Sequence, residues 1–278
     1  MKIRTIEAGD FMLDGGAMFG VVPQTIWSRT NPADDKNRIP LKARSLLIEN
    51  GARKILVDTG LGNKQSAKFF GYYDWSDETK LTDELRKAGI EPENITDVFL
   101  THLHFDHCGG TTYLDENSKT KLTFPNAAIW TNRKHWEWAI EPNAREKASF
   151  LKENLLPMQE SGKLRFVEDG HDLPFEWITV NGHTEEQMLP LITLKKQKLL
   201  FMADLLPTVH HVPLPYVMSY DMRPLETLKE RQKWFVKAAE EGWHLILEHD
   251  FEHECCNLTI DEKGVKLHQT YSLSDINL

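Results

Sequence analysis

The chain has few cysteines and lacks any long apolar run. Three cysteines occur among 278 residues, an odd number that includes the adjacent pair Cys255 and Cys256. We therefore expect reduced thiols in a cytoplasmic protein and no disulfide framework. The first residues lack the sustained apolar core of a signal peptide. No apolar stretch reaches the roughly 18 residues that a membrane-spanning helix needs.

Positively charged residues are fewer than negatively charged ones. Lys and Arg number 33 against 42 Asp and Glu, which gives a formal net charge of −9. An acidic chain does not attract nucleic acid or anionic membranes, so we expect neither as a partner. Apolar content of 40% and charged content of 27% are ordinary for a globular protein. The length suits one large domain or two small ones, and we predict a single domain over residues 1–278.

Short apolar runs predict several strands. Runs at 44–49 and 54–60 flank the dipeptide Asn50–Gly51, which is typical of a β-hairpin. Other strands are expected at 97–102, 127–130, 164–168, 177–182, twice within 188–204, at 244–250, and as a final pair within 257–272.

Three segments predict helices. Residues 76–89 have a candidate cap at Ser76 or Asp77, early acids and late bases. Residues 144–162 have helical spacing, although Pro157 should bend or end that helix. Residues 223–242 have proline in the first turn and glycine at the end. Strands mixed with helices favour an α/β sandwich over separate domains.

Within the stretch "DVFLTHLHFDHCGG", residues 97–110, three histidines and one aspartate lie within the six positions 102–107. His102 and His104 are two residues apart, so on an extended backbone they face the same side. Asp106 and His107 follow a turn that the two glycines after Cys108 should help to form. The two pairs can therefore hold two ions, and each pair needs further ligands from later in the chain.

Three later residues end predicted strands, where a scaffold fixes functional groups. They are His183 in "TVNGHT", Asp204 in "LLFMAD" and His249 in "LILEHD". Each of them alone would more often be a packed, capping or surface residue. Their order and their strand-end positions make them candidate ligands. We expect Cys108 to be a small buried residue, and five histidines to be ordinary: His135, His171, His244, His253 and His268.

The motifs "THLHFDH", "GHT", "AD" and "EHD", in this order, resemble those of the metallo-β-lactamase superfamily. The resemblance covers about residues 58–250. It implies a four-layer αβ/βα sandwich of two mixed sheets flanked by helices, with a metal centre at one edge. It also implies the ligand sets: His102, His104 and His183 for one metal, Asp106, His107 and His249 for the second, and Asp204 bridging both.

All seven candidate ligands offer nitrogen or oxygen, which suits two zinc ions and also admits manganese, iron or cobalt. Such a pair lowers the pKa of bound water to roughly 7, so a bridging hydroxide can attack a small ester or lactone directly. The resemblance implies that Asp106 orients this hydroxide or moves its proton. Asp58 in "VDTG" looks like the family's early aspartate, which supports the ligand loop.

Segments 15–29 and 203–224 resemble the branch of small-molecule hydrolases that includes N-acyl-homoserine lactonases and organophosphate hydrolases. Well-studied lactonases carry a tyrosine three residues after the bridging aspartate, where this chain has Pro207. Tyr220, His210 or His211 is then the candidate donor to the substrate oxygen, and we choose Tyr220. An apolar pocket is expected to be lined by Met18, Phe19, Trp27, Phe70, Tyr72 and Tyr73.

Alternatives remain open. The same centre suits hydrolysis of phosphotriesters or phosphodiesters. A mononuclear iron persulfide dioxygenase uses fewer ligands, and a non-catalytic binding protein usually loses ligands, so the full set of seven disfavours both. A homodimer is possible if Trp136 and Trp138 are exposed and form a contact.

Overall fold

The computed structural model describes residues 1–75 and 80–277. The chain divides into two compact units. The first unit contains Met1–Asp10 and Ala43–Pro174, and the second contains Phe11–Lys42 and Phe175–Leu278. Each unit draws on separated parts of the sequence, because the chain passes from one unit to the other within its first two strands.

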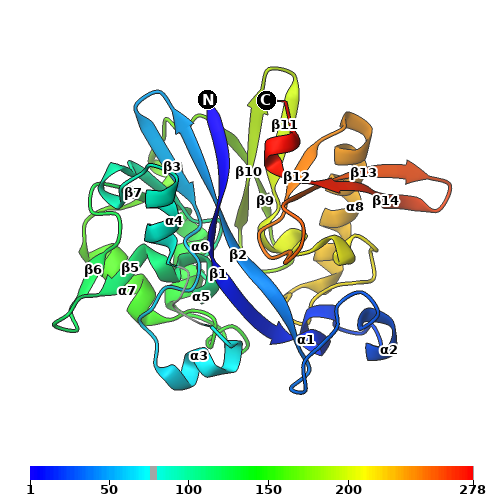
Figure 1. Cartoon of the computed structure of the whole chain (residues 1–278), viewed down its shortest axis with the longest axis horizontal. Helices are drawn as coiled ribbons and strands as arrows, with labels where there is room; N and C mark the ends of the chain where they lie inside the picture. Colours follow the sequence, from blue (N-terminus) through cyan, green and yellow to red (C-terminus); the bar gives the residue numbers. More distant parts are fainter. Residues whose placement is uncertain (76–79, 278) are drawn as a thin grey trace. The chain divides into compact units, whose positions relative to one another are not determined.

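The first sheet has six strands in the order β1-β2-β3-β4-β7-β8. Figure 1 labels β1, β2, β3 and β7 of this sheet. The strands β2 and β3 are antiparallel and form the expected hairpin, whereas β3, β4, β7 and β8 run parallel to one another. The bounds are β1 (Lys2–Asp14), β2 (Arg38–Asn50), β3 (Arg53–Val57), β4 (Asp97–Phe99), β7 (Ala128–Thr131) and β8 (Leu164–Phe166). A separate antiparallel pair is formed by β5 (Thr112–Leu114) and β6 (Thr120–Leu122).

The apolar residues of the parallel strands β3 and β4, at the centre of this sheet, are buried. Leu56, Val57, Val98 and Phe99 each have 0% exposure. Strands that are covered on both faces read as continuous apolar runs, which is why the sequence indicated them clearly. Their carboxyl ends lie at the same edge of the sheet, and the chain there continues into Asp58 and the histidine motif.

The second sheet also has six strands, in the order β14-β13-β12-β11-β10-β9. Strands β11 and β12 are parallel and the other neighbours are antiparallel. As a result β9, β11 and β12 all point the same way and end at one edge. The bounds are β9 (Glu176–Val180), β10 (Gln187–Leu194), β11 (Gln197–Phe201), β12 (His244–Ile246), β13 (Cys255–Asp261) and β14 (Gly264–Tyr271).

Helices accompany both sheets. In the second unit the longest helix, α8 (Pro224–Glu241), packs on β13. It begins with proline and ends at Gly242 in the left-handed conformation, as the sequence predicted. The other helices are α1 (Gly15–Phe19), α2 (Gln24–Trp27), α3 (Ala67–Tyr73), α4 (Leu81–Lys87), α5 (Phe105–Cys108), α6 (Arg133–Ile140) and α7 (Lys152–Glu160). Single 3₁₀ turns are η1 (Pro92–Asn94), η2 (Gly109–Thr111), η3 (Val167–Asp169), η4 (Ala203–Leu205), η5 (Val209–His211) and η6 (Leu273–Asp275).

Two helix predictions differ from the structure. The helix expected over 144–162 is confined to α7, and residues 144–149 form turns instead. Pro157 lies inside α7, which continues three residues beyond it. Helix α4 is shorter than the expected 76–89, and the predicted caps Ser76 and Asp77 lie outside the described residues.

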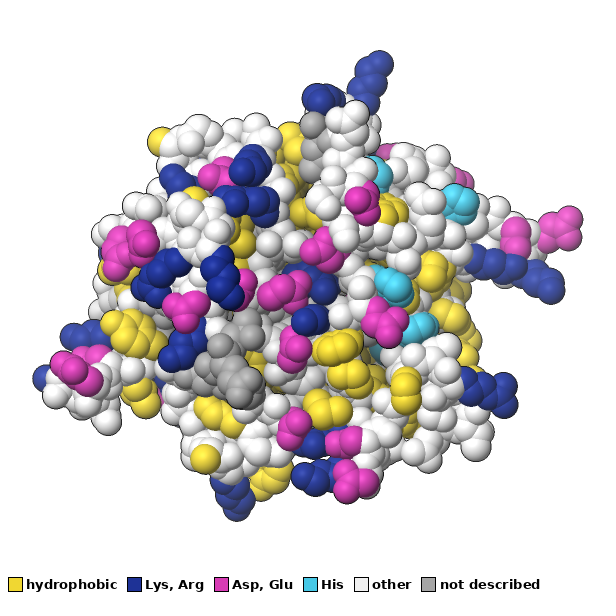
Figure 2. Space-filling view, viewed as in Figure 1, with side chains coloured by type: hydrophobic (Ala, Val, Ile, Leu, Met, Phe, Trp, Pro, Cys, Tyr) yellow, Lys and Arg dark blue, Asp and Glu magenta, His cyan; other side chains and the backbone are white. Residues whose placement is uncertain are grey.

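On the face shown in Figure 2, acidic and basic side chains lie interspersed. The net negative charge therefore does not gather into one patch on this face. Among the described residues, no helix has both the length and the apolar character needed to cross a bilayer.

Candidate functional site

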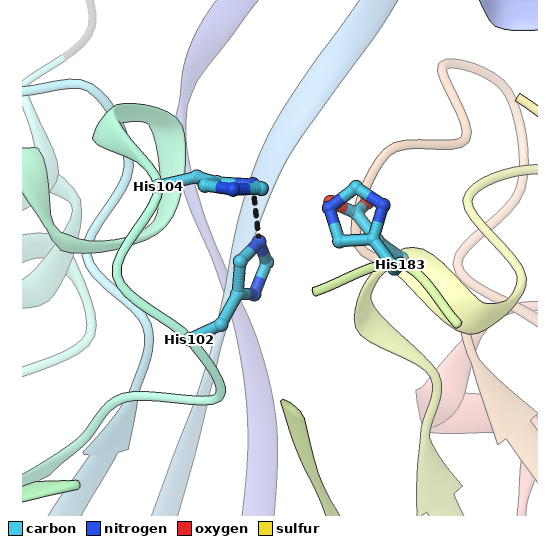
Figure 3. Close-up of side chains that lie close together, drawn as sticks. His102, His104 and His183 are labelled. Carbon is cyan, nitrogen blue, oxygen red and sulfur yellow. Dashed lines mark hydrogen bonds and ion pairs between the residues drawn. The ribbon is translucent and has the colours of Figure 1, made fainter. Parts of the chain in front are cut away.

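The histidine motif lies in the loop that follows β4 in the first unit. His102, His104 and His107 are all buried, at 0%, 6% and 0% exposure. His102 Nε2 lies 3.1 Å from His104 Nδ1, and the rings of His102 and His107 are 3.9 Å apart at their centroids. Figure 3 shows the first of these contacts as a dashed line; the third histidine labelled there, His183, belongs to the second unit. The motif thus gathers its imidazoles into one buried cluster.

Asp58 supports this histidine cluster through hydrogen bonds. Its carboxylate accepts hydrogen bonds from the Thr101 backbone N–H at 2.8 Å and from the Thr101 hydroxyl at 2.6 Å. The same carboxylate accepts from His107 Nδ1 at 3.1 Å. Thr101 Oγ1 also lies 3.1 Å from His102 Nδ1. Asp58 therefore orients two of the histidines, in agreement with the supporting position expected for it.

Asp106 is the fourth member of the motif and is also buried. One carboxylate oxygen lies 3.7 Å from His107 Nε2. Both residues lie on the short helix α5. Next to them, Cys108 is fully buried and donates its S–H to Leu103 O, and burial raises the pKa of its thiol to about 12. The prediction of a small buried cysteine is confirmed.

Gly109 and Gly110 serve close packing rather than an unusual backbone conformation. Neither has a positive φ. A side chain at Gly109 would collide with the carbonyl of Leu61, and one at Gly110 with the carbonyl of Thr59. Because these glycines have no side chains, the loop of the histidine motif packs closely against the loop that follows β3.

The second unit brings its three candidate ligands together at the strand ends. Asp204 presents a different oxygen to each histidine: His183 Nε2 lies 3.0 Å from Oδ2, and His249 Nε2 lies 3.1 Å from Oδ1. All three side chains are buried, at 3%, 5% and 2% exposure. They follow β9, β11 and β12, whose carboxyl ends share one edge of the sheet. The expectation that strand ends would converge is confirmed within this unit.

The other nitrogen of each histidine already has a partner. His249 Nδ1 lies 2.8 Å from the carbonyl of Lys42, which can only accept, so Nδ1 carries the proton. His183 Nδ1 lies 2.9 Å from Asp221 Oδ1 and donates in the same way. In neutral imidazoles the Nε2 lone pairs then face the negative oxygens of Asp204, which is repulsive without a cation between them. Buried nitrogen and oxygen donors arranged in this way fit divalent metal ions such as zinc.

The pKa of His183 also indicates that a positive charge is favoured between this histidine and Asp204. Burial alone would lower the pKa of His183, but the charges and hydrogen bonds of Asp204 and Asp221 outweigh it and raise that pKa to about 10. A positive charge is therefore favoured at this position. A bound divalent metal ion supplies positive charge in place of the second imidazole proton.

The loop that contains Tyr220 is tied to His183. Met222 N–H donates to the His183 carbonyl at 3.0 Å, and Arg223 N–H donates to the Gly182 carbonyl at 2.8 Å. Asp221, which the sequence did not indicate, contacts the His183 ring from this loop. Tyr220 is half-buried beside it, so the structure places the candidate donor in the same unit as His183 and Asp204.

His211 is unsuited to be a donor to substrate. Its Nδ1 contacts the Thr208 hydroxyl at 2.8 Å and its Nε2 contacts the Met18 carbonyl at 2.9 Å. Burial, assisted by the charge of Arg231, lowers the pKa of His211 to about 3. Both nitrogens are used within the fold. Of the two neighbouring histidines, only His210 is partly exposed, and its Nδ1 contacts Asn31.

Several expected pocket residues form the core instead. Met18, Phe19 and Trp27 are at most 1% exposed, and Phe19 stacks between Trp27 and His211 at centroid distances of 5.6 and 4.5 Å. They stabilise the second unit rather than line an open pocket. In the first unit Tyr72 is 61% exposed and points to solvent.

Other aromatic side chains lie beside the ligand loop. The Tyr73 and Phe69 rings pack against Phe105 at centroid distances of 4.9 and 5.2 Å. Burial and the nearby charge of Asp106 raise the pKa of Tyr73 to about 12, so its hydroxyl stays protonated. This cluster, Phe69, Tyr73 and Phe105, offers apolar surface directly adjacent to the motif.

The tryptophans expected in a dimer contact are not free. Trp136 is only 4% exposed and packs near Phe166 in the first unit. Trp138 is half-buried, and its indole N–H donates to Glu146 at 2.7 Å. The assumption that both are exposed was wrong, because the helix that carries them packs against the unit's own core.

His135 was expected to be ordinary and is not. Its Nε2 accepts a hydrogen bond from the Leu103 backbone N–H at 2.8 Å, between the first two motif histidines. It lies on α6, and no local signal in the sequence connects α6 to the motif. Only the tertiary contact reveals that this helix supports the ligand loop.

Known proteins resemble this chain in sequence and in fold. The sequence model of the metallo-beta-lactamase superfamily matches residues 38–239. An N-acyl homoserine lactonase from a Bacillus species is 29% identical over 207 residues, covering 70% of this chain and 71% of the relative. A probable metal-dependent hydrolase from Staphylococcus aureus has 27% identity and a TM-score of 0.86 over 97% of this chain and 98% of that one. AidC, a dizinc quorum-quenching lactonase in complex with a product, has 23% identity and a TM-score of 0.77, covering 98% and 95%.

The family match covers well over half of the chain and includes the histidine motif, His183 and Asp204. The expected fold class, two mixed sheets with helices, is confirmed by the strand order and by the structural likeness to the staphylococcal hydrolase. Each unit contains a buried cluster of histidine and aspartate donors of the kind that binds metal. The chain therefore belongs to the metallo-β-lactamase superfamily and is a metal-dependent hydrolase related to N-acyl homoserine lactonases.

Proposed function

We propose that this hydrolase uses two metal ions to open a small lactone or ester, with an N-acyl-homoserine-lactone-like molecule as the substrate class. The observation that carries the proposal is the geometry of Asp204, whose two oxygens each face the Nε2 atom of a different histidine. A carboxylate that serves two imidazoles in this way is suited to bridge two cations.

The proposed ligand sets follow the family resemblance. His102, His104 and His183 would hold one metal, Asp106, His107 and His249 the other, and Asp204 both. Zinc suits these donors, and manganese, iron or cobalt are alternatives. When bound, such ions lower the pKa of water to roughly 7 and polarise the oxygen of a carbonyl group.

The chain's own residues would handle protons and position the substrate. Asp106 is buried beside His107 and would orient the attacking water and accept its proton. Tyr220 would donate a hydrogen bond to the carbonyl oxygen, replacing the tyrosine that is missing at Pro207. Donors aimed at the oxygen where charge develops contribute strongly to catalysis of acyl transfer.

The substrate class is supported by an apolar surface and by the relatives. Phe105 directly precedes Asp106 in the chain, and the apolar cluster that it forms with Phe69 and Tyr73 would accommodate an acyl group. The matched Bacillus relative is an N-acyl homoserine lactonase. A net charge of −9 makes an anionic phosphodiester a less suitable substrate than an uncharged lactone.

Metal content and substrate preference test the proposal together. Protein purified without added metal should contain about two equivalents of zinc or manganese, and it should hydrolyse N-acyl homoserine lactones faster than phosphotriesters. A single iron would instead indicate the oxygenase alternative. Faster hydrolysis of phosphotriesters than of lactones would instead favour the alternative that this protein is a phosphotriester hydrolase.

Substitutions test the ligand assignment. Asp204→Asn and His183→Ala should lose metal and activity together, because each removes a donor. His253→Ala is the matched control: this half-buried histidine follows His249 by four residues, and its loss should leave metal content unchanged. Full activity in both ligand variants would refute the assigned centre.

A further inference from the structure

We propose that Glu146 is a positioning residue that fixes the tautomer of His104, so that Nδ1 rather than Nε2 is its metal-binding atom. This inference rests on the proposed function in one respect, namely that His104 is a ligand. The motif gave no indication of this pairing, because 42 positions separate His104 and Glu146 in sequence.

Glu146 is a buried carboxylate held in a fixed direction. It is 2% exposed. Its Oε2 accepts from Trp138 Nε1 at 2.7 Å and from Asn143 Nδ2 at 2.6 Å. The other oxygen, Oε1, lies 3.4 Å from His104 Nε2, at the long end of hydrogen-bond distances. Two donors on one oxygen therefore aim the second oxygen at the imidazole.

The segment around Glu146 is itself bound to the ligand loop. Phe105 N–H donates to the Ser149 carbonyl at 2.9 Å. The Phe150 ring lies 4.7 Å from the His104 ring. The turns at 144–149, which replace the first part of the expected helix, therefore contact the motif next to His104 and hold Glu146 near it.

The pairing decides which nitrogen of His104 carries the proton. An ionised carboxylate only accepts, so the proton lies on Nε2 and the Nδ1 lone pair faces His102 Nε2 at 3.1 Å. On His102, Nδ1 donates to the Thr101 hydroxyl, whose own hydrogen goes to Asp58. Two lone pairs then face one another in a buried place. They repel unless a cation lies between them, so Glu146 prepares this pair for a metal.

Glu146→Gln tests the tautomer directly. Trp138 and Asn143 both donate to Oε2, so a glutamine amide must turn its oxygen toward them and its NH₂ group toward His104. That NH₂ group donates to Nε2 and shifts the imidazole proton to Nδ1, the atom proposed to bind metal. Long-range ¹⁵N–¹H spectra of the metal-free protein should show His104 protonated at Nε2 in the wild type and at Nδ1 in the variant.

Zinc affinity provides the second readout. Chelator competition should give a loss of about 10- to 100-fold for Glu146→Gln, the usual effect of removing a carboxylate that orients a ligating histidine. Glu146→Asp keeps an acceptor and should retain the wild-type tautomer with part of the affinity. This rescue would not be expected if the side chain merely filled space.

Asp97→Asn is the matched control in the same unit. Asp97 is a buried carboxylate that accepts an indole N–H, from Trp130 at 2.8 Å, and it pairs with Arg53 away from the motif. Its replacement should lower stability and leave the His104 tautomer and zinc affinity unchanged. An unchanged tautomer with wild-type zinc affinity in Glu146→Gln would overturn the inference. The wild-type protein could also fail to bind zinc while Glu146→Gln still changes the His104 tautomer. That result would support the positioning role of Glu146 and refute the proposed function.

Discussion

His107 donates its Nδ1 proton to Asp58 over 3.1 Å, and both side chains are completely buried. The bond keeps the proton on Nδ1, so Nε2 of His107 is the atom that would bind a metal. Asp58 itself has a left-handed backbone, with φ of 55°. A strained backbone position at the end of a strand thus places the charge that orients a histidine of the motif.

Asp58→Asn should weaken zinc binding by about 10- to 100-fold, because the amide no longer fixes the His107 proton through a charge. Asparagine also tolerates the left-handed backbone, so the fold should persist. Zinc content after dialysis against a chelator measures the effect. Asp74→Asn is the control, since exposed Asp74 has a similar φ of 51° and lies at the end of α3. Equal zinc retention by both variants would contradict the role assigned to Asp58.

Tyr220→Phe should lower kcat by about 10²-fold while leaving two metal equivalents in place, because only the hydroxyl donor is lost. Steady-state kinetics with an N-acyl homoserine lactone, alongside metal analysis, measure both quantities. Tyr216→Phe in the same loop serves as the control. Its ring packs edge-on against Phe19 at 6.1 Å, a contact that phenylalanine retains. An undiminished kcat in Tyr220→Phe would remove this residue from the mechanism.

His211→Gln should change how stability depends on pH. Burial lowers the pKa of His211 to about 3, below the usual 6.5 of the unfolded chain. The unfolded state therefore binds a proton first as pH falls, and the folded state loses up to about 1.4 kcal/mol per pH unit between pH 6.5 and 3. Glutamine does not titrate, so urea unfolding of the metal-free variant should show a shallower decline over this range. Parallel curves for the two proteins would contradict the assignment of a neutral His211.

Metal removal should destabilise the protein most at alkaline pH. The pKa of His183 is raised to about 10 because Asp204 and Asp221 outweigh the effect of burial. In the metal-free protein this proton stabilises the fold below pH 6.5 and is lost as pH rises toward 10. Zinc supplies the missing charge and binds more tightly as protons leave the ligands. The rise in Tm on adding zinc should therefore be larger at pH 9 than at pH 6.5, and a smaller rise at pH 9 would contradict this account.

Strong local patterns were predicted well. The hairpin around Asn50–Gly51 and the long helix α8 were both recognised, because turn chemistry and capping residues are local signals. The long strand β1 was missed, since its buried residues do not alternate regularly along the strand. Residues 144–151 were wrongly predicted as helix because their spacing is helical, whereas residues 144–149 form turns that contact the loop of the histidine motif.

By itself, the sequence determined the chemistry of this protein: the crowded histidine motif and its later partners at strand ends specify donor atoms and their order. Only the tertiary structure decided how those donors are oriented. Asp221, Glu146 and the carbonyl of Lys42 each fix the proton on one imidazole nitrogen, and none of them belongs to a recognisable motif. The physical reason is that a hydrogen bond to a histidine needs an acceptor in the right place, which any carboxylate or backbone carbonyl can provide.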